Sequence, residues 1–171
     1  MKKILIALTA LGLGACGQPV YRQVETPLPV ASIDIDRYLG LWHEAARLPN
    51  SFERDCVDVT AEYARREDGL ISVLNTCRES DGSVRDAEGR ARFAGAETEG
   101  KLKVSFFGPF WGDYWVVERA DDYAWAIVSE PGGRFLWVLT RDDELTAEER
   151  AFFQTRVEAL GFRPGDLIWA S

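Results

Sequence analysis

The sequence is poor in the residues that most often carry catalytic and metal chemistry. Its 171 residues include one histidine, three cysteines and one methionine. A single histidine excludes a zinc site built from several imidazoles. The sequence also lacks HExxH, GxSxG, paired CxxC and GxxxxGK[ST] motifs, which excludes the usual signatures of metalloproteases, serine hydrolases and P-loop nucleotide binding. We therefore expect no metal site, no cofactor and no catalytic residues.

Basic residues are also few. Twenty lysines and arginines stand against 28 aspartates and glutamates, which gives a formal net charge of −8. An acidic surface repels phosphate backbones, so we expect no nucleic-acid partner.

Long apolar runs are few as well, and the main one lies at the N-terminus. Residues 4–13 follow Lys2 and Lys3 and are too short to span a bilayer, but they suit the apolar region of a signal peptide. The next residues, Leu13-Gly14-Ala15-Cys16, resemble the lipobox of bacterial lipoproteins. That resemblance implies cleavage before Cys16 and lipidation of its thiol and new N-terminus. The alternative is an ordinary signal peptide followed by a chance cysteine.

Three segments follow from this reading. Residues 1–15 are predicted to be a signal peptide, residues 16–33 a lipidated cysteine and an extended tether that holds three of the seven prolines, and residues 34–171 one folded domain. Removing residues 1–15 leaves 18 basic and 28 acidic side chains, a net charge of −10. Gly17 stands where an inner-membrane retention signal typically carries aspartate, which favours the outer membrane.

The folded part alternates apolar and polar residues in short segments separated by Gly, Asp and Asn turn signals. Strands are expected from Gly40 and at residues 57–63, 71–77, 87–93, 101–106, 114–118, 125–129 and 135–141, with a last short strand at 167–170. Thr146 opens a capping box before a helical pattern that Gly161 ends. The pattern predicts an all-β fold, an eight-stranded antiparallel up-and-down barrel with one C-terminal α-helix packed outside. An immunoglobulin-like sandwich is the alternative, but it explains neither the helix nor the opening Gly40 and Trp42.

Three short motifs occur in a recognisable order along the chain. They are Gly40-Leu-Trp42, Asp122-Tyr123 before the seventh strand, and Arg141 at the end of residues 135–141. Together with Ser51-Phe-Glu-Arg54 and residues 103–110, they resemble the lipocalin family, and within it the bacterial outer-membrane lipoprotein lipocalins. The resemblance covers residues 33–170. Two departures are His43, where bacterial members usually have tyrosine, and the absence of a threonine just before Asp122.

The resemblance implies that Gly40, Trp42 and Arg141 form the closed floor of the barrel. The residues support this independently, because a barrel brings its first and last strands together. A buried arginine is costly unless it stacks on an aromatic ring and donates to carbonyls. We assign these residues a structural role.

Cys56 and Cys77 remain after Cys16 is lipidated. They start and end a predicted hairpin that turns near Arg66, so they lie opposite one another in an oxidising compartment. We predict a disulfide, with a reactive thiol pair as the alternative. His43 neighbours the inward Trp42 and is expected at the surface or the rim.

The ligand site is expected inside the barrel. Strand alternation places one set of polar and aromatic side chains inward: Glu44, Tyr63, Asn75, Phe93, Phe106, Tyr114, Phe135 and Trp137. The Glu44 carboxylate is expected to bind a ligand headgroup or to pair with an Arg or Tyr of a neighbouring strand.

The family implies a function in binding a hydrophobic small molecule, a fatty acid or lysophospholipid, that is stored or transported for outer-membrane maintenance. The protein is then lipid-anchored and faces the periplasm. Two alternatives are an enzyme in the same barrel, using Glu44 with Tyr114 or Asn75, and a carrier of a tetrapyrrole or isoprenoid. Trp115 and Val117 are expected to be exposed and to mark a possible homodimer contact.

Overall fold

The structure is a computed structural model that describes residues 20–170. The predicted signal peptide and the predicted lipidation site at Cys16 lie outside these residues.

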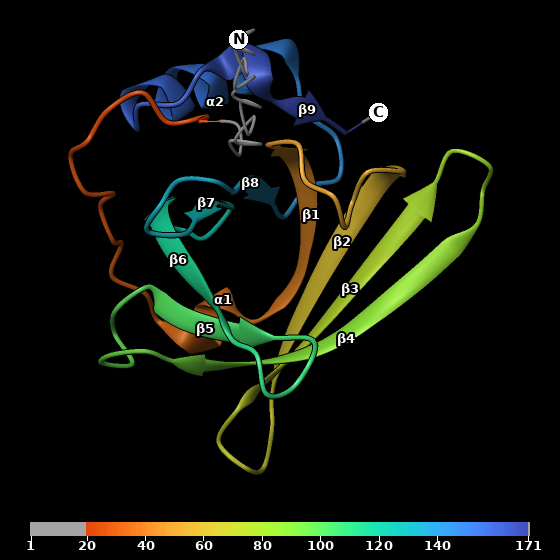
Figure 1. Ribbon diagram of the computed structural model, residues 1–171, viewed down its shortest axis with the longest axis vertical. Helices are drawn as coiled ribbons and strands as arrows, with labels where there is room; N and C mark the ends of the chain where they lie inside the picture. The colour runs from red at the N-terminus through yellow and green to blue at the C-terminus, as the bar shows by residue number, and fades with distance from the viewer. Residues whose placement is uncertain (1–19, 171) are drawn as a thin grey trace, which may run out of the picture.

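The described chain is a closed antiparallel barrel with a helix against its outer side (Figure 1). The strands are β1 (Gly40–Arg47), β2 (Cys56–Arg65), β3 (Ile71–Glu79), β4 (Val84–Phe93), β5 (Lys101–Ser105), β6 (Gly112–Arg119), β7 (Trp125–Ser129), β8 (Leu136–Thr140) and β9 (Ile168–Trp169). Strands β2 to β8 pair in chain order, and β1 closes the ring by pairing with both β8 and β2. β9 pairs with β1 from outside the ring. The eight-stranded barrel prediction is confirmed.

Alternation within the strands places apolar side chains in the interior. In β2, Val59, Ala61 and Tyr63 are buried while Glu62 is exposed, because successive side chains point to opposite faces. A β-bulge between Cys56 and Asp58 shifts the register at the start of this strand. Strict alternation over residues 57–63 would place Val57 on the inward face with Val59, but the bulge places Cys56 there instead.

The helix α2 (Ala147–Ala159) has the predicted capping box. The Thr146 hydroxyl accepts from the backbone N–H of Glu149, whose carboxylate accepts from the backbone N–H of Thr146. Its buried side chains, Phe153 and Val157, pack on the outer faces of β7 and β8 in a second hydrophobic core. The backbone then leaves the helix at Gly161, where φ is +89°.

Two short elements were not anticipated. α1 (Ile35–Tyr38) begins at Asp34, whose side chain accepts from the N–H of Asp36, and a 3₁₀ turn, η1 (Pro164–Asp166), precedes β9. Four residues are too few to show a helical period, so the sequence pattern could not predict α1.

Residues 20–33, here called the strap, are extended but lie along the barrel. The backbone N–H of Gln23 donates to the Gly161 carbonyl at 2.7 Å, and that of Ala31 donates to the Val116 carbonyl at 2.9 Å. Leu28 of the strap is buried in the outer core together with Val117, and Trp115 packs against that core. The prediction that Trp115 and Val117 form an exposed homodimer contact is wrong, because α2 and the strap cover this face.

The barrel wall is incomplete beside β4. β5 pairs with β4 only from Arg90 to Phe93, so residues 84–89 of β4 extend beyond their β5 neighbour (Figure 1). Gly89 allows the Phe106 ring to lie against this part of the β4 backbone, since a Cβ there would meet the ring.

Candidate functional site

One end of the barrel is closed by α1 and the start of β1. The guanidinium carbon of Arg141 lies 3.7 Å from the centre of the fully buried Trp42 ring. Arg141 also donates to four carbonyls, those of Arg37, Tyr38, Leu39 and Leu41. The Trp42 indole donates to the Tyr38 carbonyl at 2.8 Å. Gly40 adopts a φ of +92°, which lets the chain turn into β1.

Above this floor lies a cavity of about 560 Å³ with a predominantly apolar lining. Seven of the eight residues predicted for the ligand site line it: Glu44, Tyr63, Asn75, Phe106, Tyr114, Phe135 and Trp137. The eighth, Phe93, packs partly buried against the interior core and is not part of the lining. The open end, here called the mouth, is formed by the loops that contain Phe52, Phe107 and Phe110.

Three tyrosine hydroxyls meet inside the cavity. Tyr114 Oη lies 2.7 Å from Tyr38 Oη and 2.9 Å from Tyr63 Oη. Burial raises the pKa of Tyr63 to about 12 and the pKa values of Tyr38 and Tyr114 well above 10. The cluster is therefore neutral at physiological pH, and two hydrogen bonds use two of its three protons. Sequence reasoning missed Tyr38 because it lies on α1 and not on a strand.

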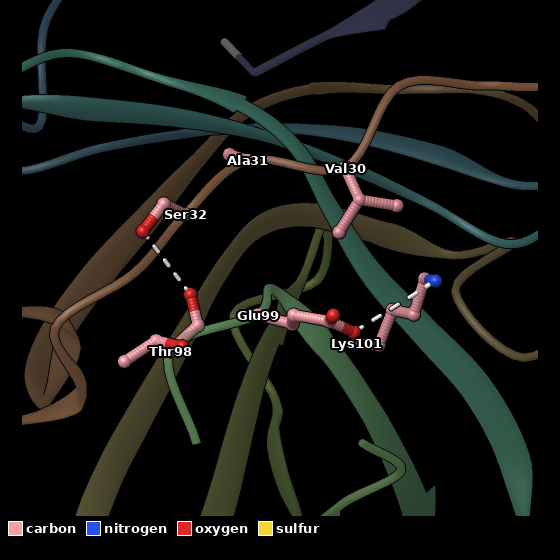
Figure 2. A pocket seen from close by; sticks show the side chains of 6 residues that line it. All are labelled: Val30, Ala31, Ser32, Thr98, Glu99 and Lys101. Carbon is pink, nitrogen blue, oxygen red and sulfur yellow. Dashed lines mark hydrogen bonds and ion pairs between the residues drawn. The ribbon is translucent and has the colours of Figure 1, made fainter. Parts of the chain in front are cut away.

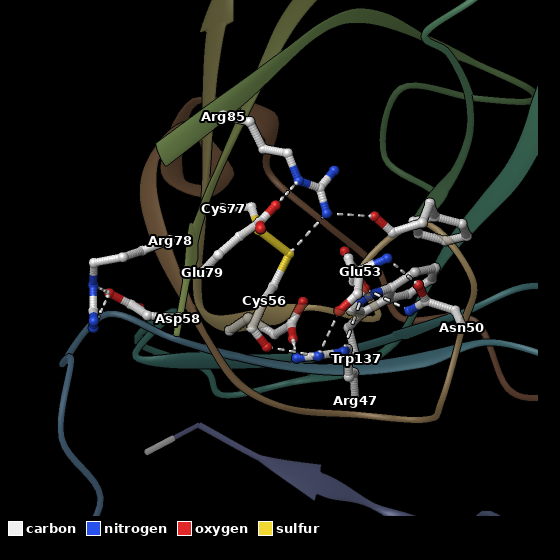
Figure 3. Close-up of a disulfide and its surroundings, with 12 residues drawn as sticks. Arg47, Asn50, Glu53, Cys56, Asp58, Cys77, Arg78, Glu79, Arg85 and Trp137 are labelled. Carbon is white, nitrogen blue, oxygen red and sulfur yellow. Dashed lines mark hydrogen bonds and ion pairs between the residues drawn. A yellow bond between two sulfur atoms is a disulfide. The ribbon is translucent and has the colours of Figure 1, made fainter. Parts of the chain in front are cut away.

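A charged network lies in the cavity wall near the mouth (Figure 3). Arg47 Nη1 donates to Glu44 Oε1 at 2.8 Å, and Arg47 Nη2 donates to the carbonyls of Glu53 and Cys56. The indole of Trp137 donates to Glu53 Oε2 at 3.1 Å. Glu44 therefore pairs with an arginine of its own strand, and the expected partner on a neighbouring strand is wrong. The register shift between Glu44 and Ala46 turns Arg47 toward the same side as Glu44.

Burial raises the pKa of Glu44 to about 8, and the nearby charge of Glu53 adds to the rise. The charge and hydrogen bond of Arg47 lower the pKa of Glu44, but they do not offset the effect of burial. Protonated Glu44 is a neutral hydrogen-bond donor and acceptor in the cavity wall.

Asn75 offers a second polar contact to the cavity. Its Oδ1 atom is buried and has no hydrogen-bond partner within residues 20–170. It lies between Ala61 of β2 and Ala87 of β4, whose small side chains leave space beside it. A buried acceptor without a partner is costly, and a ligand donor at this position removes the cost.

Cys56 and Cys77 form the predicted disulfide (Figure 3). It links β2 to β3 where both residues line the cavity. His43 is half-buried within β1 and is not part of the cavity lining. Over the described range, no three His, Cys, Asp or Glu side chains are arranged to hold a metal ion. Likewise, no helix of residues 20–170 is long and apolar enough to cross a bilayer.

A second hollow of about 290 Å³ lies outside the barrel, between the strap and the start of β5 (Figure 2). Ser32 donates to the Thr98 carbonyl at 3.2 Å, and Lys101 Nζ lies 3.8 Å from a Glu99 carboxylate oxygen. These groups already pair with one another, so the larger internal cavity is the candidate site.

The comparisons with known proteins agree with this geometry. A model of the lipocalin-like domain matches residues 33–171. The chain belongs to the lipocalin family.

Two relatives of this lipocalin are outer membrane lipoproteins named Blc. The protein of Vibrio cholerae is 46% identical over 144 residues, which cover 82% of this chain and 81% of the relative. That of Escherichia coli K12 is 37% identical over 167 residues, which cover 97% and 93%. Lipocalins bind and carry small hydrophobic molecules, so the relatives place this chain among binding proteins and not enzymes.

The fold of this lipocalin also matches a solved structure. Insecticyanin from the tobacco hornworm Manduca sexta aligns with a TM-score of 0.69 at 22% identity, over 88% of this chain and 87% of insecticyanin.

Proposed function

We propose that this lipocalin binds a fatty acid or lysophospholipid in its cavity and stores or transports it for outer-membrane maintenance. Lipidation of Cys16 anchors the protein to the outer membrane, facing the periplasm. The similarity of the chain to outer membrane lipoproteins of V. cholerae and E. coli supports this location.

The apolar cavity of about 560 Å³ is the observation that carries this proposal. Its volume lies within the range of about 300–1,000 Å³ typical of small-molecule sites. Each methylene removed from water contributes about 0.8 kcal/mol, so an acyl chain of about sixteen carbons gains on the order of 10 kcal/mol before ordering costs. Burial of the acyl chain therefore provides the main driving force.

The polar groups of the wall then favour a headgroup that can donate. Glu44 and Asn75 present oxygen atoms to the cavity, and Asn75 Oδ1 lacks a partner among the described residues. A hydroxyl or ammonium group of a lysophospholipid would donate a hydrogen bond to these oxygens, and the O–H of a protonated Glu44 would donate to a fatty-acid carboxylate.

Tryptophan fluorescence titration tests the proposal, because Trp137 lines the cavity. We expect saturable changes with micromolar lysophospholipid or fatty acid. No saturable change with either lipid would contradict lipid binding.

Two neighbouring substitutions on β4 provide a matched pair. Ala87 lines the cavity and Glu88 is exposed on the opposite face of the same strand. Ala87→Trp should reduce lipid affinity at least about tenfold by filling the cavity, whereas Glu88→Trp should leave it unchanged. Equal affinities of the two variants would place the ligand outside the barrel.

A further inference from the structure

We propose that the mouth of the barrel docks on the bilayer that carries the lipid anchor, with Phe107 and Phe110 entering the membrane interface. The inference rests on the lipidation of Cys16 in the proposed function. It goes beyond that function by proposing how the barrel is oriented relative to the bilayer and which residues contact the membrane.

The strap runs from the mouth of the barrel to its floor. β8 ends at the floor, where Arg141 covers Trp42, so the turn before β8 lies at the mouth. The Arg22 side chain packs against Gly133 in that turn, and its Nε donates to the Leu160 carbonyl at 3.0 Å.

The other end of the strap is bound near the floor. The backbone N–H of Ile33 donates to the Thr98 carbonyl at 2.9 Å, and Ser32 donates to the same carbonyl (Figure 2). The strap then continues into α1, which closes the floor. Because both ends are bound, the direction in which the chain leaves the barrel is set by the structure.

The short distance from Arg22 to the anchor restricts which end can meet the membrane. Arg22 is six positions after Cys16. A fully extended chain spans at most about 3.6 Å per residue, so the lipid on Cys16 stays within about 20 Å of Arg22. The mouth is therefore held near the bilayer surface, while the floor lies at the far end of the strap.

The mouth also carries the most exposed aromatic side chains. Phe107 and Phe110 are 79% and 77% exposed, in the loop between β5 and β6. Residues 106–111 of that loop contain no charged side chain, although 28% of the chain is charged. Inserting these rings therefore requires no desolvation of a charge within the loop.

Cations stand beside this uncharged loop. The guanidinium carbons of Arg90 and Arg92 lie 5.4 and 4.4 Å from the Trp111 ring centre. Aromatic rings with adjacent basic groups are typical of surfaces that lie in the membrane interface, where the cations meet lipid phosphates. The bilayer is therefore the occupant that fits both the anchor position and the composition of the mouth. Docking in this orientation lets a lipid move between bilayer and cavity without crossing water.

Fluorescence quenching of Trp111 tests the orientation. The full lipidated chain is placed in vesicles of phosphatidylethanolamine and phosphatidylcholine with brominated acyl chains. Trp111→Phe, compared with the unsubstituted chain, isolates the contribution of this residue from that of Trp137 inside the cavity. We expect Trp111 to be quenched, and Phe107→Ser/Phe110→Ser to lower its quenching at least about twofold.

The matched control replaces exposed apolar residues elsewhere. Leu41 lies at the floor end and Phe152 on α2, and they are 47% and 42% exposed. Leu41→Ser/Phe152→Ser should leave the quenching of Trp111 unchanged. Circular dichroism confirms that each double variant is folded.

Two results with the mouth variant would overturn the inference. One is equal quenching of Trp111 in the mouth variant and the unsubstituted chain. The other is a mouth variant that light scattering shows to be a monomer where the unsubstituted chain is a dimer, with the quenching of Trp111 unchanged. That result would show that a second copy of the chain, and not the bilayer, covers the mouth.

The proposed function can fail separately. Lipid titration that saturates without any Trp111 quenching would overturn the orientation alone. Mass spectrometry that finds Cys16 unmodified would overturn both the anchor and the orientation, and leave the lipid-binding cavity standing.

Discussion

Arg141 illustrates how a single residue closes the barrel. Its guanidinium lies on the Trp42 ring and donates to four carbonyls between residues 37 and 41, at the junction of α1 and β1. These carbonyls come from the end of a helix and the start of a strand, where the backbone has few partners of its own. The side chain therefore joins the first and last strands of the ring.

Arg141→Ala should lower the free energy of unfolding by on the order of 3 kcal/mol, because the cation–π contact and the donors to these carbonyls are lost. Urea denaturation measures this change. Arg134→Ala, at an exposed arginine of the mouth, should shift stability by less than about 0.5 kcal/mol. Lipid affinity should persist in both variants, and unchanged stability of Arg141→Ala would contradict its role at the floor.

Glu44 gives the protein a predictable pH dependence. Its pKa is raised from 4.5 to about 8 in the folded protein, mainly by burial. Between these two pH values the folded state therefore binds more protons than the unfolded state. The contribution of Glu44 to the free energy of unfolding is complete below about pH 4.5 and is lost as the pH rises toward 8.

Glu44→Gln should flatten the decline in unfolding free energy across that pH window, since glutamine does not titrate and still offers an oxygen to Arg47. Denaturation at several pH values measures the slope. An identical slope in the variant would show that Glu44 is ionised throughout.

At the scale of elements, the β2–β3 hairpin is reinforced by the disulfide. Cys56 and Cys77 are 21 positions apart and close a loop near the mouth. Replacing both with alanine should lower the free energy of unfolding by about 3 kcal/mol, because the unfolded chain regains freedom. Thiol titration of the denatured, unreduced chain, with Cys16 lipidated, should detect no free thiol. A chain with two titratable thiols and unchanged stability would contradict this prediction.

Strand alternation in the sequence predicted the barrel and most of the cavity lining, and the capping box at Thr146 with the helical pattern after it predicted the helix. It succeeded where a strand is regular, as for Tyr63 in β2 and Trp137 in β8. It failed at bulges, because an extra residue changes the face of the following side chains. Arg47 and Val57 both lie beside such a bulge. The sequence therefore could not predict that Glu44 pairs with Arg47, or that the Cys56 side chain faces the cavity.

The other differences arise from contacts between distant parts of the chain. Val117 alternates like a surface residue in its strand, yet Leu28 lies with it in the outer core. Tyr38 reaches the cavity from α1 and bonds to Tyr114, 76 positions away. Local sequence patterns carry no information about these pairings.

For the whole molecule, ligand binding and stability are linked. A lipid that binds only the folded barrel at 100 times its dissociation constant should add about 2.7 kcal/mol to the free energy of unfolding. Thermal denaturation with and without lysophospholipid measures the shift. At the same lipid concentration the shift should fall to about 1.4 kcal/mol or less in Ala87→Trp, because its affinity is at least about tenfold lower. An undiminished shift in this variant would contradict binding in the cavity.

The part of β4 that extends past β5 also bears on solubility. A strand edge without a neighbour invites addition of a strand from another molecule, the first step of aggregation. Three of the six residues from 84 to 89 are charged, namely Arg85, Asp86 and Glu88, and Phe106 covers the backbone at Gly89. Edge-to-edge pairing of two copies would take these charges out of water, which is costly. The opening in the wall is thus protected against self-assembly even where a crowded surface concentrates many copies.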